Sequence, residues 1–224
     1  MQIEFWAPIK LSIEIAAFSG MLAVILGILA ARMMLRHADM KGRMLIETFF
    51  LLPIILPPTV IGFLLVILFG QNSPVGQLIF TLFDQSLIFT WAAAAIASMV
   101  VAFPLMYQSA KAGFGSVNPE IEDAARIDGG TEWKIFWKIS LPLAGRSLLA
   151  GAILTLARAL GEFGATLMFA GNIPGKTQTM PVAIYMAFES GKTELAWTWV
   201  GIMILMSIGM LGIIQLLQNK HSGD

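Results

Sequence analysis

Cysteine is missing from this chain of 224 residues, and charged residues are scarce at 12% of the sequence. Without thiols there can be no disulfides, cysteine nucleophiles or thiolate metal sites. The two histidines, His37 and His221, stand in polar junctions, where we expect solvated surface side chains. We therefore expect no metal site, no cofactor and no catalytic residue.

Apolar residues dominate instead, at 57% of the chain, whereas a soluble domain carries about 25% charged residues. The stretches 15–31, 48–83, 85–110 and 195–219 contain no charge at all. A helix needs roughly 20 apolar residues to cross a bilayer, so lipid is the expected solvent.

This pattern predicts an all-α fold, a polytopic membrane helical bundle with five transmembrane helices. The transmembrane domain is expected to cover residues 9–218, with spans at about 11–33, 49–69, 87–110, 147–169 and 196–218. The N-terminal stretch lacks the cationic lead and cleavage site of a signal peptide, so the first span is expected to be retained.

Positive charge is unevenly divided between the predicted loops. The segments 32–43 and 111–146 are rich in lysine and arginine, the loop 71–86 has neither, and the loop 171–195 has only Lys176 and Lys192. Because cytoplasmic loops carry the excess of positive charge, we expect the N-terminus outside and the C-terminus in the cytoplasm.

Three prolines interrupt the second predicted span, at Pro53, Pro57 and Pro58. Proline removes backbone donors, so a regular helix is not expected there. Irregular backbone at membrane depth is tolerated inside protein or along a water-filled cavity. The segment is either a packing kink or a gate near the outer side in which Pro57 and Pro58 line the pathway.

The polar loop 111–146 is patterned as two short helices. Asn118 is a predicted N-cap, Pro119 takes the first helical position, and Gly129 with Gly130 ends the helix.

A second helix is expected from Thr131, with Trp133, Phe136 and Trp137 on one face and Pro142 as its end. Such an amphipathic hairpin either lies on the lipid surface or docks into a groove of a partner.

The string EDAARIDGG from Glu122, followed by KISLP, resembles the cytoplasmic signature of ABC importer permeases. The signature's usual glutamate falls on Asp123, directly after Glu122, which leaves open which carboxylate takes that role. The resemblance implies that this stretch, the coupling loop (residues 111–146), inserts into a cleft of an ATPase subunit. The residues that it assigns to the contact are Glu122, Asp123, Ala124, Ala125, Gly129, Ile139, Leu141 and Pro142.

The strings LPIILPPTVIGF, AFPLM, ARALGEFGAT and GNIPGKTQTMP extend this resemblance to molybdate-transport permeases, whose relatives carry tungstate or sulfate. It implies a type I ABC importer permease in the bacterial cytoplasmic (inner) membrane. The implied partners are a second copy forming a homodimer, a cytoplasmic ABC ATPase dimer, an extracytoplasmic molybdate-binding protein and membrane lipid, with no nucleic acid.

Arg158 and Glu162 are the only charges inside the span predicted at 147–169. A charged side chain at mid-bilayer costs about 2.5 to 3.5 kcal/mol, so both should face protein or water. They stand one helical turn apart and can pair. Two interpretations stay open, a structural ion pair and a role in the pathway or gate.

The string GNIPGKT has three residues between Gly171 and its Gly-Lys pair, whereas a phosphate-binding loop has four between its first glycine and that pair. It also follows a predicted span and has no strand before it. We therefore expect a separate subunit to hydrolyse ATP and this chain not to be an enzyme. An intramembrane enzyme and a passive channel or ion-coupled carrier are the weaker alternatives.

Overall fold

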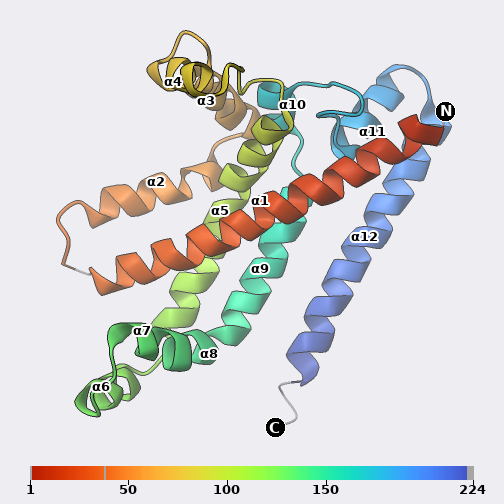
Figure 1. The fold of residues 1–224 in the computed structure, drawn as a ribbon. Coiled ribbons are helices and arrows are strands. Elements are labelled where there is room, and N and C mark those ends of the chain that lie inside the picture. The colour runs from red at the N-terminus through yellow and green to blue at the C-terminus, as the bar shows by residue number, and fades with distance from the viewer. Residues whose placement is uncertain (1, 38, 221–224) are drawn as a thin grey trace.

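The computed structural model describes residues 2–37 and 39–220, so His221 lies outside the described residues. Every regular element in these ranges is a helix (Figure 1), which confirms the predicted all-α fold. The helices are α1 Gln2–Arg36, α2 Arg43–Ile55, α3 Pro58–Phe69, α4 Pro74–Phe83, α5 Trp91–Gly115, α6 Pro119–Ile127, α7 Glu132–Ile135, a π turn Phe136–Ser140, α8 Leu141–Leu143, α9 Gly145–Leu160, α10 Gly164–Ala170, α11 Met180–Glu189 and α12 Thr193–Lys220.

Three helices, α1, α5 and α12, are each long and apolar enough to cross a membrane. Two bent pairs also meet this test: α2 with α3, bent by 120°, and Glu132–Leu143 with α9, bent by 75°. By length and composition the described residues thus hold three spans, or up to five if each bent pair is one span.

The interruption predicted in the second span is present between α2 and α3 at Pro57 and Pro58, but Pro53 lies inside α2 and does not end it. Leu56 and Pro57 are extended, with ψ angles of 140° and 138°. Each precedes a proline, whose ring disfavours a helical conformation of the residue before it. The helix therefore stops at Ile55 and starts again at Pro58 in a new direction.

The segment predicted as a span at 147–169 is not one helix. α9 ends at Leu160 and α10 begins at Gly164, with Gly161, Glu162 and Phe163 between them. The expectation of one continuous helix is therefore wrong near its C-terminal end, and Glu162 lies at the break rather than on a helix.

Small residues let α1, α5 and α9 approach closely at the centre of the bundle. A Cβ atom added to Gly27 of α1 would lie 2.8 Å from the Met106 Cβ of α5, and one added to Gly151 of α9 would lie 2.3 Å from the Ser109 Cβ. Close approach of two helices at a small residue of one of them is typical of helices packed in membranes.

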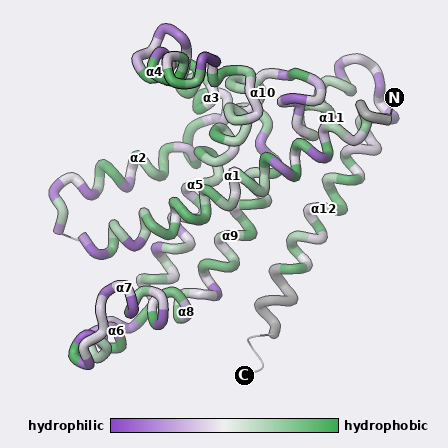
Figure 2. The backbone as a smooth tube through the Cα atoms, viewed as in Figure 1, coloured by the Kyte–Doolittle hydropathy of each residue, from purple (hydrophilic) through white to green (hydrophobic). Residues whose placement is uncertain are grey.

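Hydrophobic residues predominate along the long helices, whereas the α1–α2 turn and the α6–α7 hairpin contain many hydrophilic residues (Figure 2). These two polar segments lie at the same end of the bundle (Figure 1). On α12, Ile204, Leu205 and Ile208 are more than half exposed and α9 and α11 cover only part of the helix.

Candidate functional site

The first half of the coupling loop has the predicted helix ends. The Asn118 side-chain oxygen accepts a hydrogen bond from the Glu120 N–H at 3.0 Å, and Pro119 opens α6. Gly129 follows the helix with a φ of +82°, a conformation that glycine adopts without steric cost. The start and the stop of α6 are therefore confirmed.

The second half differs from the prediction, because Pro142 does not end the helix. The chain passes from α7 through the π turn into α8, which contains Pro142 and continues to Leu143. In the π turn the Leu141 N–H donates to the Phe136 carbonyl, five residues back. This wider turn lies directly before Pro142 and accommodates a residue that has no N–H to donate.

The three aromatic rings of this half lie next to one another, since the rings of Phe136 and Trp137 are also 5.4 Å apart, but they differ in burial. Phe136 is buried, with its ring 5.9 Å from that of Phe114 in α5. Trp133 and Trp137 are exposed, and their rings lie 5.5 Å apart. The reason is that the helix turns Ile135 and Phe136 toward the bundle, which leaves both indoles on the outer side.

Glu122 is the centre of an ion-pair network. Its carboxylate lies 3.0 Å from Arg32 and 3.2 Å from Arg126, and it also accepts a hydrogen bond from the Ser140 hydroxyl. Burial by itself raises the pKa of Glu122, but the hydrogen bonds from Ser140 and Arg32 outweigh it and hold the pKa below the ordinary value. Glu122 is therefore an ionised group that faces the bundle.

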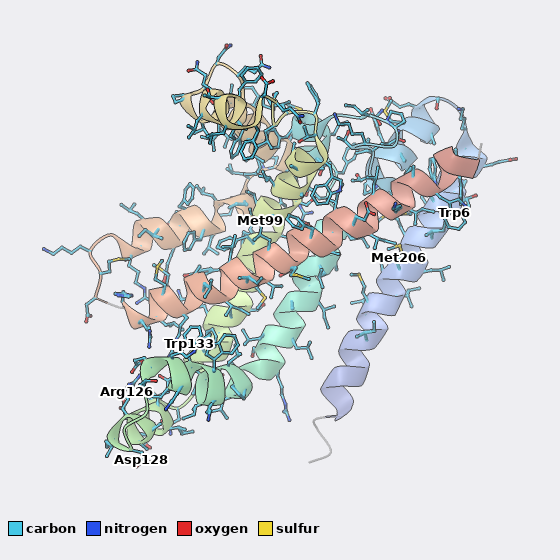
Figure 3. The ribbon with its side chains drawn as sticks, in the orientation of Figure 1. Trp6, Met99, Arg126, Asp128, Trp133 and Met206 are labelled. Atoms are coloured by element: carbon cyan, nitrogen blue, oxygen red, sulfur yellow. The ribbon has the colours of Figure 1, made fainter. Side chains whose placement is uncertain are left out.

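Asp123, by contrast, has a side chain that is 65% exposed. The other residues of the signature divide in the same way. The exposed residues of the whole signature are Asp123, Ala124, Gly129 and Pro142. The half-buried ones are Glu122, Ala125, Ile139 and Leu141. Ile127, which sequence reasoning did not single out, is almost fully exposed at the end of α6. In Figure 3, Arg126, Asp128 and Trp133 mark this hairpin, remote from Trp6 at the other end of α1.

Acid should loosen the coupling loop slightly through Glu132, whose side chain is 46% exposed, so that water screens its ion pairs. Hydrogen bonds from Arg126 and Arg36 lower the pKa of Glu132 to about 2. Because the pKa is lowered on folding, these contacts stabilise the loop above the ordinary value of 4.5 and are lost as pH falls toward about 2. In an acid titration followed by tryptophan fluorescence, we expect Glu132→Gln to remove a transition in that window; superimposable titrations of parent and variant would contradict this.

The two helix breaks lie against each other near the opposite end of the bundle. A Cβ atom added to Gly164, the first residue of α10, would lie 3.1 Å from the Pro58 Cβ and 3.2 Å from the Thr59 nitrogen. The structure thus brings the break at Pro57 and Pro58 to the break that contains Glu162.

Arg158 and Glu162 form the predicted ion pair, with 2.8 Å between the Arg158 Nη1 and the Glu162 Oε2. The Glu162 side chain is only 1% exposed, and that of Arg158 is 32% exposed. Glu162 Oε1 also accepts a hydrogen bond from the Ala165 N–H at 2.8 Å, which caps the start of α10. The sequence indicated the pair but not this cap, because the break in the helix was not foreseen.

Residues 23–222 match the family described as the binding-protein-dependent transport system inner membrane component. The chain belongs to this family of permeases. Since several of its helices are apolar enough to cross a membrane, it is a multi-pass permease of the inner membrane.

The permease is 57% identical over 212 residues to the putative molybdenum transport system permease protein YvgM of Bacillus subtilis, covering 95% of this chain and 93% of that one. It is 38% identical over 188 residues to the molybdenum transport system permease protein ModB of Haemophilus influenzae, covering 84% and 82%. A bacterial ABC transporter that imports the acidic polysaccharide alginate shares the fold, with a TM-score of 0.75 at 15% identity over 97% of this permease and 78% of that chain.

Proposed function

We propose that this permease moves molybdate across the cytoplasmic membrane and that a separate ATPase supplies the energy. The observation that carries the proposal is the 57% identity to a putative molybdenum transport permease. A sulfate transport permease, CysW of Synechocystis, is more distant at 32% identity over 217 residues, covering 97% of this chain and 78% of that one. Tungstate and sulfate remain the alternative substrates.

The proposed assembly has two copies of the domain 9–218 around a twofold axis normal to the membrane. An ATPase dimer would bind both coupling loops in the cytoplasm, and a molybdate-binding protein would deliver the substrate outside. The basic α1–α2 turn and the basic coupling loop lie at one end of the bundle. Because cytoplasmic segments carry the excess of positive charge, this position supports an external N-terminus and a cytoplasmic C-terminus.

The proposed ATPase contact uses the outward side of the coupling loop. It comprises the exposed residues Asp123, Ala124, Gly129 and Pro142, together with Ile127. This surface would be supported on the side toward the bundle by the half-buried residues Glu122, Ala125, Ile139 and Leu141. When the ATPases close on ATP, the paired loops would move and switch the pathway between inward-facing and outward-facing states.

The proposed gate is the junction of the two helix breaks, where Pro57 and Pro58 approach the segment that carries Arg158 and Glu162. The partial exposure of Arg158 supports a brief electrostatic contact with a passing dianion. Tight binding is not expected, because Glu162 neutralises most of that field. The alternative is a packing kink with a structural ion pair.

Uptake of labelled molybdate into proteoliposomes, in competition with tungstate and sulfate, tests the substrate. All three oxyanions are tetrahedral dianions, so size is what separates them. We expect strong competition by tungstate, which is nearly as large as molybdate, and weak competition by sulfate, which is smaller. Equal competition by sulfate would contradict the preference for molybdate.

A further inference from the structure

The cytoplasmic end of α1 is joined to the coupling loop by one half-buried ion pair. We propose that the contact between Arg32 and Glu122 is a positioning link that carries the movement of the coupling loop directly into α1. The inference rests on the proposed function, because it requires an ATPase that moves the loop.

The geometry of this contact favours a stiff connection. Arg32 Nη1 lies 3.0 Å from Glu122 Oε1, and Arg32 Nη2 lies 3.5 Å from Glu122 Oε2, so the guanidinium faces both carboxylate oxygens. The two side chains are only 13% and 14% exposed. A guanidinium that contacts both oxygens of a carboxylate fixes the relative orientation of the two side chains as well as their separation.

Arg32 also contacts two aromatic rings from other elements. Its guanidinium carbon lies 6.0 Å from the ring centre of Phe114, at the end of α5, and 5.7 Å from that of Phe136, in the π turn. Both distances suit a cation–π contact. A single side chain of α1 thus touches α5, α6 and the π turn.

Glu122 connects the two halves of the hairpin in turn. Its carboxylate accepts a hydrogen bond from the Ser140 hydroxyl in the π turn. It also accepts one from Arg126, which lies on the same helix, α6. If the ATPase shifts α6, either α1 follows or a half-buried charge loses its partner, which is strongly unfavourable. Movement of the loop is therefore expected to take α1 with it.

A second pair between α1 and the hairpin offers a matched control. Arg36 contacts Glu132, but these side chains are 40% and 46% exposed. Exposed ion pairs contribute little, because water and salt screen them. The control pair joins the same two parts of the chain without the burial and the aromatic rings.

The test measures molybdate imported per ATP hydrolysed, in proteoliposomes that hold the complete complex with its ATPase and binding protein. Arg32→Gln should lower this ratio roughly 2- to 30-fold, the range for mutations that alter coupling between sites. Arg32→Lys should also lower it, because lysine keeps the charge but lacks the planar guanidinium. Arg36→Gln should leave the ratio unchanged, and an equal fall in that control would overturn the inference.

Because the chain contains no cysteine, the link can be rebuilt chemically. The double variant Arg32→Cys/Glu122→Cys should be poorly coupled, and a short bifunctional thiol reagent should restore import per ATP. A ratio that stays low after cross-linking, or one that never falls in the variants, would overturn the inference. If the parent permease itself retains no ATPase, the proposed function fails instead, which is a separate result.

Discussion

Arg158→Gln should lower the melting temperature of the permease by about 6 to 20 °C, while Glu162→Gln should have a much smaller effect. Removing Arg158 leaves the buried Glu162 carboxylate without its counter-charge. Breaking a buried pair in this way costs about 3 to 5 kcal/mol, and each kcal/mol shifts the melting temperature of a chain this long by about 2 to 4 °C. Glutamine at position 162 can still accept the Ala165 N–H, and the partly exposed Arg158 can still reach water.

The double variant Arg158→Gln/Glu162→Gln separates stability from transport. We expect it to recover most of the lost melting temperature, because no unpaired charge remains buried. If Arg158 guides the oxyanion, molybdate uptake by the complete complex should stay low although the protein is stable. Uptake at the parent rate by the stable double variant would contradict the pathway role and favour a purely structural ion pair.

Gly129→Asp should leave the permease folded and yet reduce its retention of the ATPase by about tenfold or more, the size of effect seen at interface hot spots. A Cβ atom at Gly129 meets nothing within 4 Å, so the new side chain fits the isolated chain. Aspartate is also among the residues that best tolerate the left-handed conformation required by the φ of +82°. In the assembly, the added carboxylate would be desolvated against the ATPase.

Gly191→Asp provides the matched control for this experiment. Gly191 follows α11 with a φ of +73°, and a Cβ atom there also meets nothing within 4 Å. The substitution introduces the same charge in a similar backbone conformation, in the loop that we propose to be external. Co-purification with the ATPase should be unchanged for Gly191→Asp; an equal loss in both variants would mean that Gly129 is not at the contact.

The elements that the sequence predicts well are those whose ends are marked by local signals, such as capping residues, prolines and glycines. Asn118, Pro119 and Gly129 define α6 because capping and left-handed turns depend on a few neighbouring residues. The interruption at Pro57 and Pro58 follows from the missing N–H groups and the constraint on preceding residues. The pairing of Arg158 with Glu162 agrees with their spacing of four residues, although Glu162 lies just beyond the end of α9.

The elements that the sequence could not predict depend on distant contacts. No proline marks the break between α9 and α10, and it coincides with packing of Gly164 against Pro58 from another helix. The contact of Arg32 with Glu122 joins residues 90 positions apart, and no local pattern encodes it. For that reason the sequence left open which carboxylate faces the ATPase, whereas the structure turns Glu122 inward and leaves Asp123 exposed.

The most direct measurement for the account as a whole is ATP-dependent uptake of labelled molybdate by proteoliposomes that contain the permease, an ABC ATPase and the binding protein. We predict uptake only when all three proteins and ATP are present, and co-purification of the ATPase with the parent permease but not with Gly129→Asp. Uptake by the permease alone, at the same rate with and without ATP, would contradict the account and indicate a passive channel.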